Sequence, residues 1–201
     1  MYSTRAHIQI GFHGCDKSVR DQLLQNPKNV KISAKPFDWL GHGFYIWENN
    51  YDRALQWAKD KKERRKIKDA SVIGVVFTLD HCLDLIDSEF IEMLTIYYSL
   101  MKNDFKIIGK ELPQNKDIKE DVHKDLLIRE LDCAVIQYLH QKIKEEIKTE
   151  KYTALKQFDS VRGVFTEGGP AFPGAGVQKK SHIQICIRNM DCIKGFFLPR
   201  N

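Results

Sequence analysis

Apolar residues form short β-type runs near both ends of the chain and recur at helical spacing between them. The β-type runs predict six strands, at 7–12, 43–47, 71–79, 161–165, 182–188 and 192–198. The run SVIGVVFTL (71–79) is apolar almost throughout, which is typical of a strand with neighbours on both sides. Strands at both ends with helices between them favour an α+β domain over a regular alternation of strands and helices.

Apolar positions three and four residues apart predict four helices, at 16–26, 49–68, 88–104 and 119–151. Asp16 is the expected N-cap of the first helix, since its carboxylate can accept from a free backbone N–H. The last two helices fill most of the middle of the chain. We therefore expect a single domain over 1–201, with a helical insertion at about 80–155.

The segment TEGGPAFPGAGVQKKS (166–181) separates two of the predicted strands. Its four glycines and two prolines make it unsuited to a helix or a strand. Long loops of this kind are usually functional or disordered.

Composition narrows the class of protein. The chain has 201 residues, of which 42% are hydrophobic and 29% charged, as in ordinary globular domains. No window approaches 18 apolar residues, and the N-terminal stretch has no basic region followed by an apolar one, so we expect neither a membrane span nor a signal peptide. The five cysteines are scattered without CxxC spacing, which indicates reduced thiols in the cytoplasm and no metal site.

The net charge of +5 is concentrated in two segments, 59–69 and 140–156. Acidic residues are interleaved with the basic ones, which favours a solvated helix face. Attraction to nucleic acid is the functional alternative, although no recognised nucleic-acid-binding motif accompanies the charge.

Three stretches at strand ends carry candidate chemistry: GFHG (11–14), LGHGFYIW (40–47) and SHIQICIR (181–188). Gly14 and Gly43 would let the backbone approach a ligand held between strands. His13 could bind a ribose or phosphate, Tyr45 offers a flat ring for stacking, and the Gln184 amide could bridge two hydroxyls. Taken singly, each is more typical of a structural role: a strand-end histidine, a half-buried core tyrosine and a polar edge-strand residue.

Three segments, taken together and in this order, resemble the ADP-ribosyltransferase superfamily: FHG, GHGFYIWENNYDRALQWA and HIQICIR. The resemblance is to the poly(ADP-ribose) polymerase and diphtheria-toxin branch, which has the His-Tyr-Glu pattern. The nearest likeness is to small bacterial toxin-like members, whose second motif reads G-x-G-F-Y followed by A-x-x-W-A. The resemblance covers the first two motifs and, more weakly, the C-terminal strand. It does not cover the helical middle.

The resemblance implies a split mixed β-sheet that binds NAD, as co-substrate, in a cleft. By that likeness His13 would bond to a ribose of NAD, Gly14 would pair its backbone with the carboxamide, and Tyr45 would stack on the nicotinamide, with Gly43 beside it. Such enzymes cleave the N-glycosidic bond through an oxocarbenium-like state. Positioning and electrostatics therefore matter more than acid catalysis.

The third motif departs from the family pattern. Where the family places Glu, this chain has Gln184. An amide lacks the negative charge that stabilises the oxocarbenium-like cation, and its loss raises the activation free energy by a few kcal/mol. Glu167, at the start of the glycine-rich loop, is the rival carboxylate. By the same likeness His182 would recognise the acceptor, and the 166–181 loop would be the substrate-recognition loop.

The function expected from this resemblance is an NAD-dependent mono-ADP-ribosyltransferase, toxin-like or a defence effector, that modifies a protein or a nucleic acid. A cognate antitoxin would be a further partner. Three alternatives stay open. The first is an NAD-binding module or NAD glycohydrolase without transfer activity. The second is a non-enzymatic interaction protein whose GFYIW strand is core. The third is an RNA 2′-phosphotransferase that uses His13, His42, His182 and Arg188.

Overall fold

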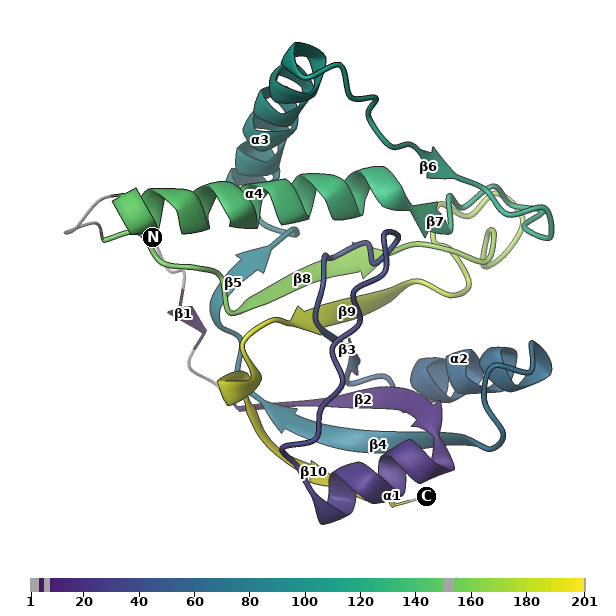
Figure 1. Cartoon of the computed structure of the whole chain (residues 1–201). Coiled ribbons are helices and arrows are strands. Elements are labelled where there is room, and N and C mark those ends of the chain that lie inside the picture. Colours follow the sequence, from purple (N-terminus) through teal and green to yellow (C-terminus); the bar gives the residue numbers. More distant parts are fainter. Residues whose placement is uncertain (1–3, 6–7, 150–153, 201) are drawn as a thin grey trace.

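The protein is an α+β fold built on one mixed sheet (Figure 1). The computed structural model describes residues 4–5, 8–149 and 154–200. Within them, eight strands lie in the order β1 (Thr4–Arg5), β5 (Asp80–Asp84), β8 (Ser160–Phe165), β9 (His182–Ile187), β3 (Phe44–Glu48), β2 (Gln9–Asp16), β4 (Ala70–Phe77) and β10 (Ile193–Phe197). β5 and β8 run parallel, and the other neighbouring strands are antiparallel.

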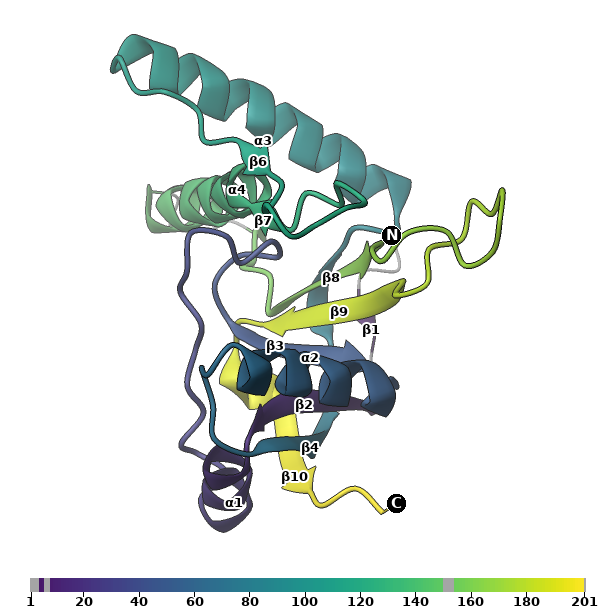
Figure 2. The same ribbon diagram turned by 90° about the vertical axis from the view of Figure 1, so that its right-hand side faces the viewer.

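The helices gather at two ends of the sheet, as Figures 1 and 2 show from two sides. α1 (Lys17–Gln25) and α2 (Tyr51–Glu63) lie against β2 and β4, whereas α3 (Ser88–Ile107) and α4 (Glu130–Thr149) pack together at the β5 and β8 end. A small second sheet joins β6 (Asn115–Lys116) to β7 (Ile128–Arg129) just before α4, and a short 3-10 helix, η1 (Met190–Cys192), precedes β10.

Two predictions about local structure are confirmed. The carboxylate of Asp16 caps α1 by accepting from the Ser18 amide at 2.9 Å. β4 is an internal strand between β2 and β10, as its apolar run indicates. The prediction that the first strand ends at 12 is wrong, because all eight residues of β2, through Asp16, pair with β4.

The prediction of a helix over 119–151 is wrong in its first third, because α4 begins only at Glu130. Before it, the Asp117 carboxylate accepts from the Leu126 amide at 2.9 Å, and the Asp121 carboxylate accepts from two further amides. Leu126 has a φ of 51°, which a right-handed helix cannot accommodate. Side-chain acceptors therefore replace the helical hydrogen bonds of this segment. Residues 150 and 151 lie outside the described part of the chain.

The helix predicted over 49–68 is too long at its C-terminal end, since α2 ends at Glu63 and Arg65 has a φ of 54°. The middle of the chain also contributes to the main sheet, because Asp80–Asp84 forms β5. Among the described residues, no helix combines the length and apolar character needed to cross a bilayer. All five cysteines are buried.

Candidate functional site

The candidate site lies where the neighbouring strands β2 and β3 part. Their ladder consists of two residue pairs and ends at Phe12 and Trp47. Beyond that point Ser33, from the segment before β3, pairs with Gly43 through N–H···O bonds of 2.9 and 3.0 Å. The backbone pairing of β2 with β3 is thus interrupted between the ladder at one end and this bridge at the other, and we call this interruption the opening between β2 and β3.

His13 bridges the opening. Its Nδ1–H donates to the Tyr45 carbonyl oxygen at 2.7 Å, and its ring centroid lies 4.5 Å from that of Phe44. Burial lowers the pKa of His13 to about 4, so the ring is neutral at pH 7. A neutral ring that donates through Nδ1 presents Nε2 as an acceptor, and this atom can receive a hydrogen bond from a hydroxyl group.

Gly14 directs its backbone N–H and C=O toward the same opening. Successive peptide groups of a strand point to alternate sides, and the Ile10 carbonyl accepts from the Asn49 amide on the β3 side. Gly14 lies four residues further along β2, so its N–H and C=O face the same way, across from Tyr45. A Cβ on Gly14 would overlap the Ala54 carbonyl of α2. Glycine is therefore needed here for the packing of α2 on β2.

Tyr45 is fixed by the protein on several sides. Its hydroxyl donates to the Gly41 carbonyl at 2.8 Å and accepts from the Leu40 amide at 2.9 Å. Its half-buried ring packs against the apolar cluster that includes Leu40, Ile136 and Cys186. Burial raises the pKa of Tyr45 well above its ordinary value, so the hydroxyl stays neutral.

The two glycines before Tyr45 make room for protein. A Cβ on Gly43 would overlap the Cys186 sulfur and the Ile187 carbonyl of β9. Gly41 has a φ of 80°, and its Cβ would lie 2.8 Å from the Gln137 side-chain oxygen of α4. The GHG sequence thus allows β3 to lie close to β9 and α4.

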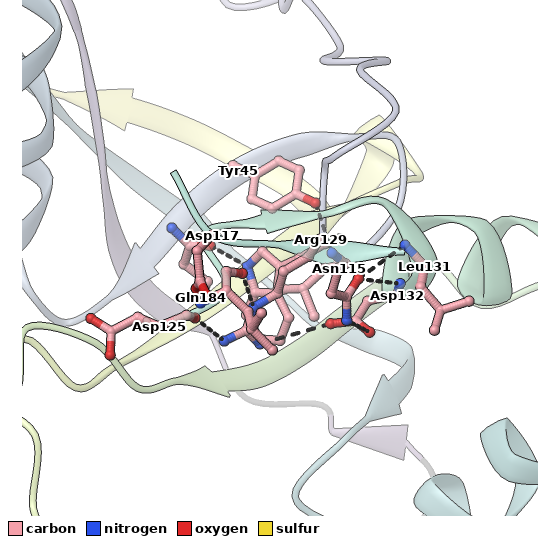
Figure 3. A network of polar contacts seen from close by, with 11 residues as sticks. Tyr45, Asn115, Asp117, Asp125, Arg129, Leu131, Asp132 and Gln184 are labelled. Atoms are coloured by element: carbon pink, nitrogen blue, oxygen red, sulfur yellow. Dashed lines mark hydrogen bonds and ion pairs between the residues drawn. The ribbon is translucent and has the colours of Figure 1, made fainter. Parts of the chain in front are cut away.

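Gln184 lies on β9 diagonally across from Tyr45, which pairs with Cys186. Its side-chain oxygen accepts from the Trp39 indole N–H at 2.6 Å. Trp39 also lies over the ring of Phe165 at 5.2 Å between centroids, and the Arg129 guanidinium lies 4.0 Å from the Phe165 ring centre. Figure 3 shows Tyr45, Gln184 and Arg129 within one polar network.

Glu167 is buried and forms an ion pair with Arg53 of α2. His182 lies beside them, with Nδ1 4.0 Å from a Glu167 oxygen. The His182 Nδ1–H donates to the Lys180 carbonyl at 2.7 Å, and burial lowers the pKa of this ring. The structure therefore brings Glu167 and His182 together. No local pattern in the sequence indicates Arg53 or Trp39, the partners of Glu167 and Gln184.

The residues named for the phosphotransferase alternative are spread apart. His182 begins β9, whereas Arg188 follows its other end. The Arg188 guanidinium donates to the His42 carbonyl at 3.0 Å and to Gln137 at 2.7 Å, so it serves internal contacts. These positions do not form one phosphate-binding cluster.

Within the residues described, no group of three or more His, Cys, Asp or Glu side chains is placed to hold a metal ion. Comparison with known protein families, with characterised proteins and with solved structures finds no match to this chain.

Proposed function

We propose that the protein binds NAD in the opening between β2 and β3 and transfers its ADP-ribose to a protein or nucleic-acid acceptor. The observation that carries this proposal is the interrupted ladder: His13 and Gly14 lie beyond its last pair, and the His13 ring bonds to the Tyr45 carbonyl. The resemblance of the FHG and GHGFYIW segments to the ADP-ribosyltransferase superfamily supports the same site.

In this proposal the nicotinamide carboxamide pairs with the N–H and C=O of Gly14, as a strand would. The His13 Nε2 accepts a hydrogen bond from a ribose hydroxyl, and the Tyr45 ring flanks the nicotinamide. Holding both halves of the glycosidic bond in this way favours its cleavage through orientation. The departing nicotinamide takes the bonding electron pair and becomes neutral, which leaves an oxocarbenium-like ribose for the acceptor to attack.

A second candidate function is NAD binding with slow hydrolysis and no transfer. Two observations favour it. The charge of Glu167 is balanced by Arg53, and the Gln184 oxygen is occupied by Trp39. The Glu167 charge is neutralised in this conformation and the Gln184 amide carries none, so fast transfer requires the Arg53–Glu167 contact to change.

The test combines thermal stability with nicotinamide release in the presence of NAD. Wild type should be stabilised by NAD, and His13→Gln should lose that stabilisation and the release. His81→Gln is the matched control. His81 lies on β5, and its Nδ1 also bonds to a backbone carbonyl, that of Gln157, at 2.9 Å. The proposal would be refuted if both variants showed the same stabilisation by NAD and the same nicotinamide release. It would also be refuted if millimolar NAD neither stabilised wild type nor released nicotinamide, with or without a cell extract as acceptor.

Transfer and hydrolysis are separated by labelled NAD. A transferase leaves the labelled ADP-ribose on a macromolecule that protease or nuclease digestion then identifies. A hydrolase releases it free. If the protein is a toxin-like effector, its expression in bacteria should arrest growth with wild type and not with His13→Gln, and a cognate antitoxin would relieve the arrest.

A further inference from the structure

A separate cavity lies between the segment before α4 and the 166–181 loop. Its volume is about 420 Å³, within the usual range for small-molecule sites. Its walls are lined by residues of two segments, His123 to Leu126 with Arg129 on one side, and Thr166, Gly169, Pro170 and Gln178 on the other. None of these residues belongs to β2 or β3.

The first wall is held by aspartates that accept backbone N–H groups. Asp117 binds the Leu126 amide at 2.9 Å, and Asp121 binds the Asp125 amide at 2.8 Å (Figure 3 shows the Asp117 and Asp125 region). Lys124 and Leu126 are thereby kept at φ values of 57° and 51°. Such left-handed positions cost free energy in non-glycine residues and persist only where the surroundings fix them.

The second wall is also fixed by its own hydrogen bonds. The Lys179 amide donates to the Gly169 carbonyl at 2.8 Å, and Pro170 pairs with Gln178. The Asp125 carboxylate ties the two walls together by accepting from the Gly168 amide at 2.7 Å. The cavity is therefore formed in advance and does not depend on a ligand to order it.

The groups left for a ligand are mainly donors. The Asp125 carboxylate, the one acid on the lining among the described residues, is already bonded, whereas Lys124 is exposed and makes no ion pair. The Arg129 Nε–H donates to the Leu126 carbonyl at 3.2 Å, and the guanidinium rests on the Phe165 ring. Its Nη2–H donates to the Asp125 carbonyl at 3.5 Å, and its Nη1 forms an ion pair with Asp132 at 3.8 Å, a separation too long for a hydrogen bond.

We propose that this cavity binds a nucleotide through its phosphate monoester. The stacked Arg129 guanidinium still has N–H groups on Nη1 and Nη2 that make no hydrogen bond among the described residues, and it lies next to an exposed lysine. Such a pair suits the oxygens of a phosphate. The cavity is much larger than a phosphate group alone, so part of the nucleoside enters with it. The nucleotide is either free or the phosphorylated 5′ end of a nucleic acid, and the site is independent of the NAD site proposed above.

The test is a calorimetric titration with uridine monophosphate, which shares no base with NAD. Uridine and inorganic phosphate serve as the two partial ligands. Wild type should bind uridine monophosphate at least tenfold more tightly than uridine, and the affinity should fall with added salt. A 5′-phosphorylated oligouridine is compared with its 5′-hydroxyl form. Tighter binding of the phosphorylated oligomer than of the mononucleotide identifies a nucleic-acid end as the source, and the reverse identifies a free nucleotide.

Variants locate the binding. Lys124→Gln should weaken the affinity for uridine monophosphate about fivefold or more, and Arg129→Gln about tenfold or more, since each variant loses a charged hydrogen bond to the phosphate. Lys124 is exposed, so its variant stays informative even if Arg129→Gln fails to fold. Lys144→Gln, an exposed position of α4 with the same charge change, should bind as wild type does.

The proposal would be overturned if wild type bound uridine and uridine monophosphate with equal affinity. It would also be overturned if Lys124→Gln and Lys144→Gln bound uridine monophosphate with equal affinity. His13→Gln separates it from the proposed function. That variant should keep its affinity for uridine monophosphate while losing stabilisation by NAD, so failure at one site does not imply failure at the other.

Discussion

Arg53 of α2 and Glu167 after β8 form an ion pair whose side chains are only 11% and 12% exposed. The Nε and Nη1 atoms of Arg53 are buried without a hydrogen-bond partner among the described residues. The pair joins α2 to the start of the 166–181 loop. It therefore links the helix that covers β2 to the loop that lines the nucleotide cavity.

Removing one member of this pair leaves a buried charge unbalanced. We expect Glu167→Gln to lower the free energy of unfolding by about 3 kcal/mol. Arg53→Met combined with Glu167→Leu should recover most of that loss, because both charges and the unpartnered donors are removed together. Urea denaturation of the single and double variants measures this coupling. Additive losses would show that the two charges do not interact.

The stability of the fold should depend on the protonation of His13. Burial lowers its pKa from 6.5 in the unfolded chain to about 4 in the folded protein. Between these two pH values the unfolded chain binds a proton that the folded protein does not. The free energy of unfolding should therefore fall as the pH drops from about 6.5 to 4, by up to about 3 kcal/mol from this residue.

Urea denaturation of wild type and His13→Gln between pH 4.5 and 7 tests this dependence. The variant should show a shallower decline, with the remainder arising in part from His140, whose pKa burial lowers to about 3. Parallel curves for the two proteins would show that His13 is not buried in its neutral form.

Gly14 should not tolerate a methyl group. Gly14→Ala places a Cβ against the Ala54 carbonyl of α2, and we expect a loss of about 3 kcal/mol in the free energy of unfolding. Gly176→Ala is the control, since nothing lies within 4 Å of its added Cβ, and its effect should stay within about 0.5 kcal/mol. Thermal denaturation of both variants makes the comparison. A stable Gly14→Ala protein would mean that α2 does not pack this closely on β2.

The cysteines should be unreactive in the native protein. All five are buried, and burial raises the pKa of Cys15, Cys186 and Cys192 to about 12 and that of Cys133 to about 11. Since the thiolate is the reactive form, Ellman's reagent at pH 8 should modify no thiol before unfolding and five after it. A thiol that reacts quickly in the native state would reveal local opening around it.

Local patterns predicted the elements whose structure depends on neighbouring residues. The apolar run of β4 and the cap at Asp16 are of this kind, because burial on both sides and a side-chain acceptor can each be inferred from a few residues. The segment before α4 could not be predicted in this way. Its helical periodicity competes with aspartates that bind backbone N–H groups, and the outcome depends on geometry that the pattern does not contain.

The environment of the candidate residues depends on contacts distant in sequence. Trp39 and Gln184 are 145 residues apart, and Arg53 and Glu167 are 114 apart. The sequence pointed to Gln184 and Glu167 through their positions at strands, yet nothing near either residue indicates a partner so far away. The cavity likewise arises from two segments, 123–129 and 166–178, that only the folded chain brings together.

The order of the strands has a consequence during synthesis. β3, which carries Tyr45, lies between β2 and β9, and β9 begins 134 residues after β3 ends, at His182. The sheet around the opening therefore stays incomplete on the ribosome until residues 182–187 have emerged, and any activity of that opening can begin only after this point.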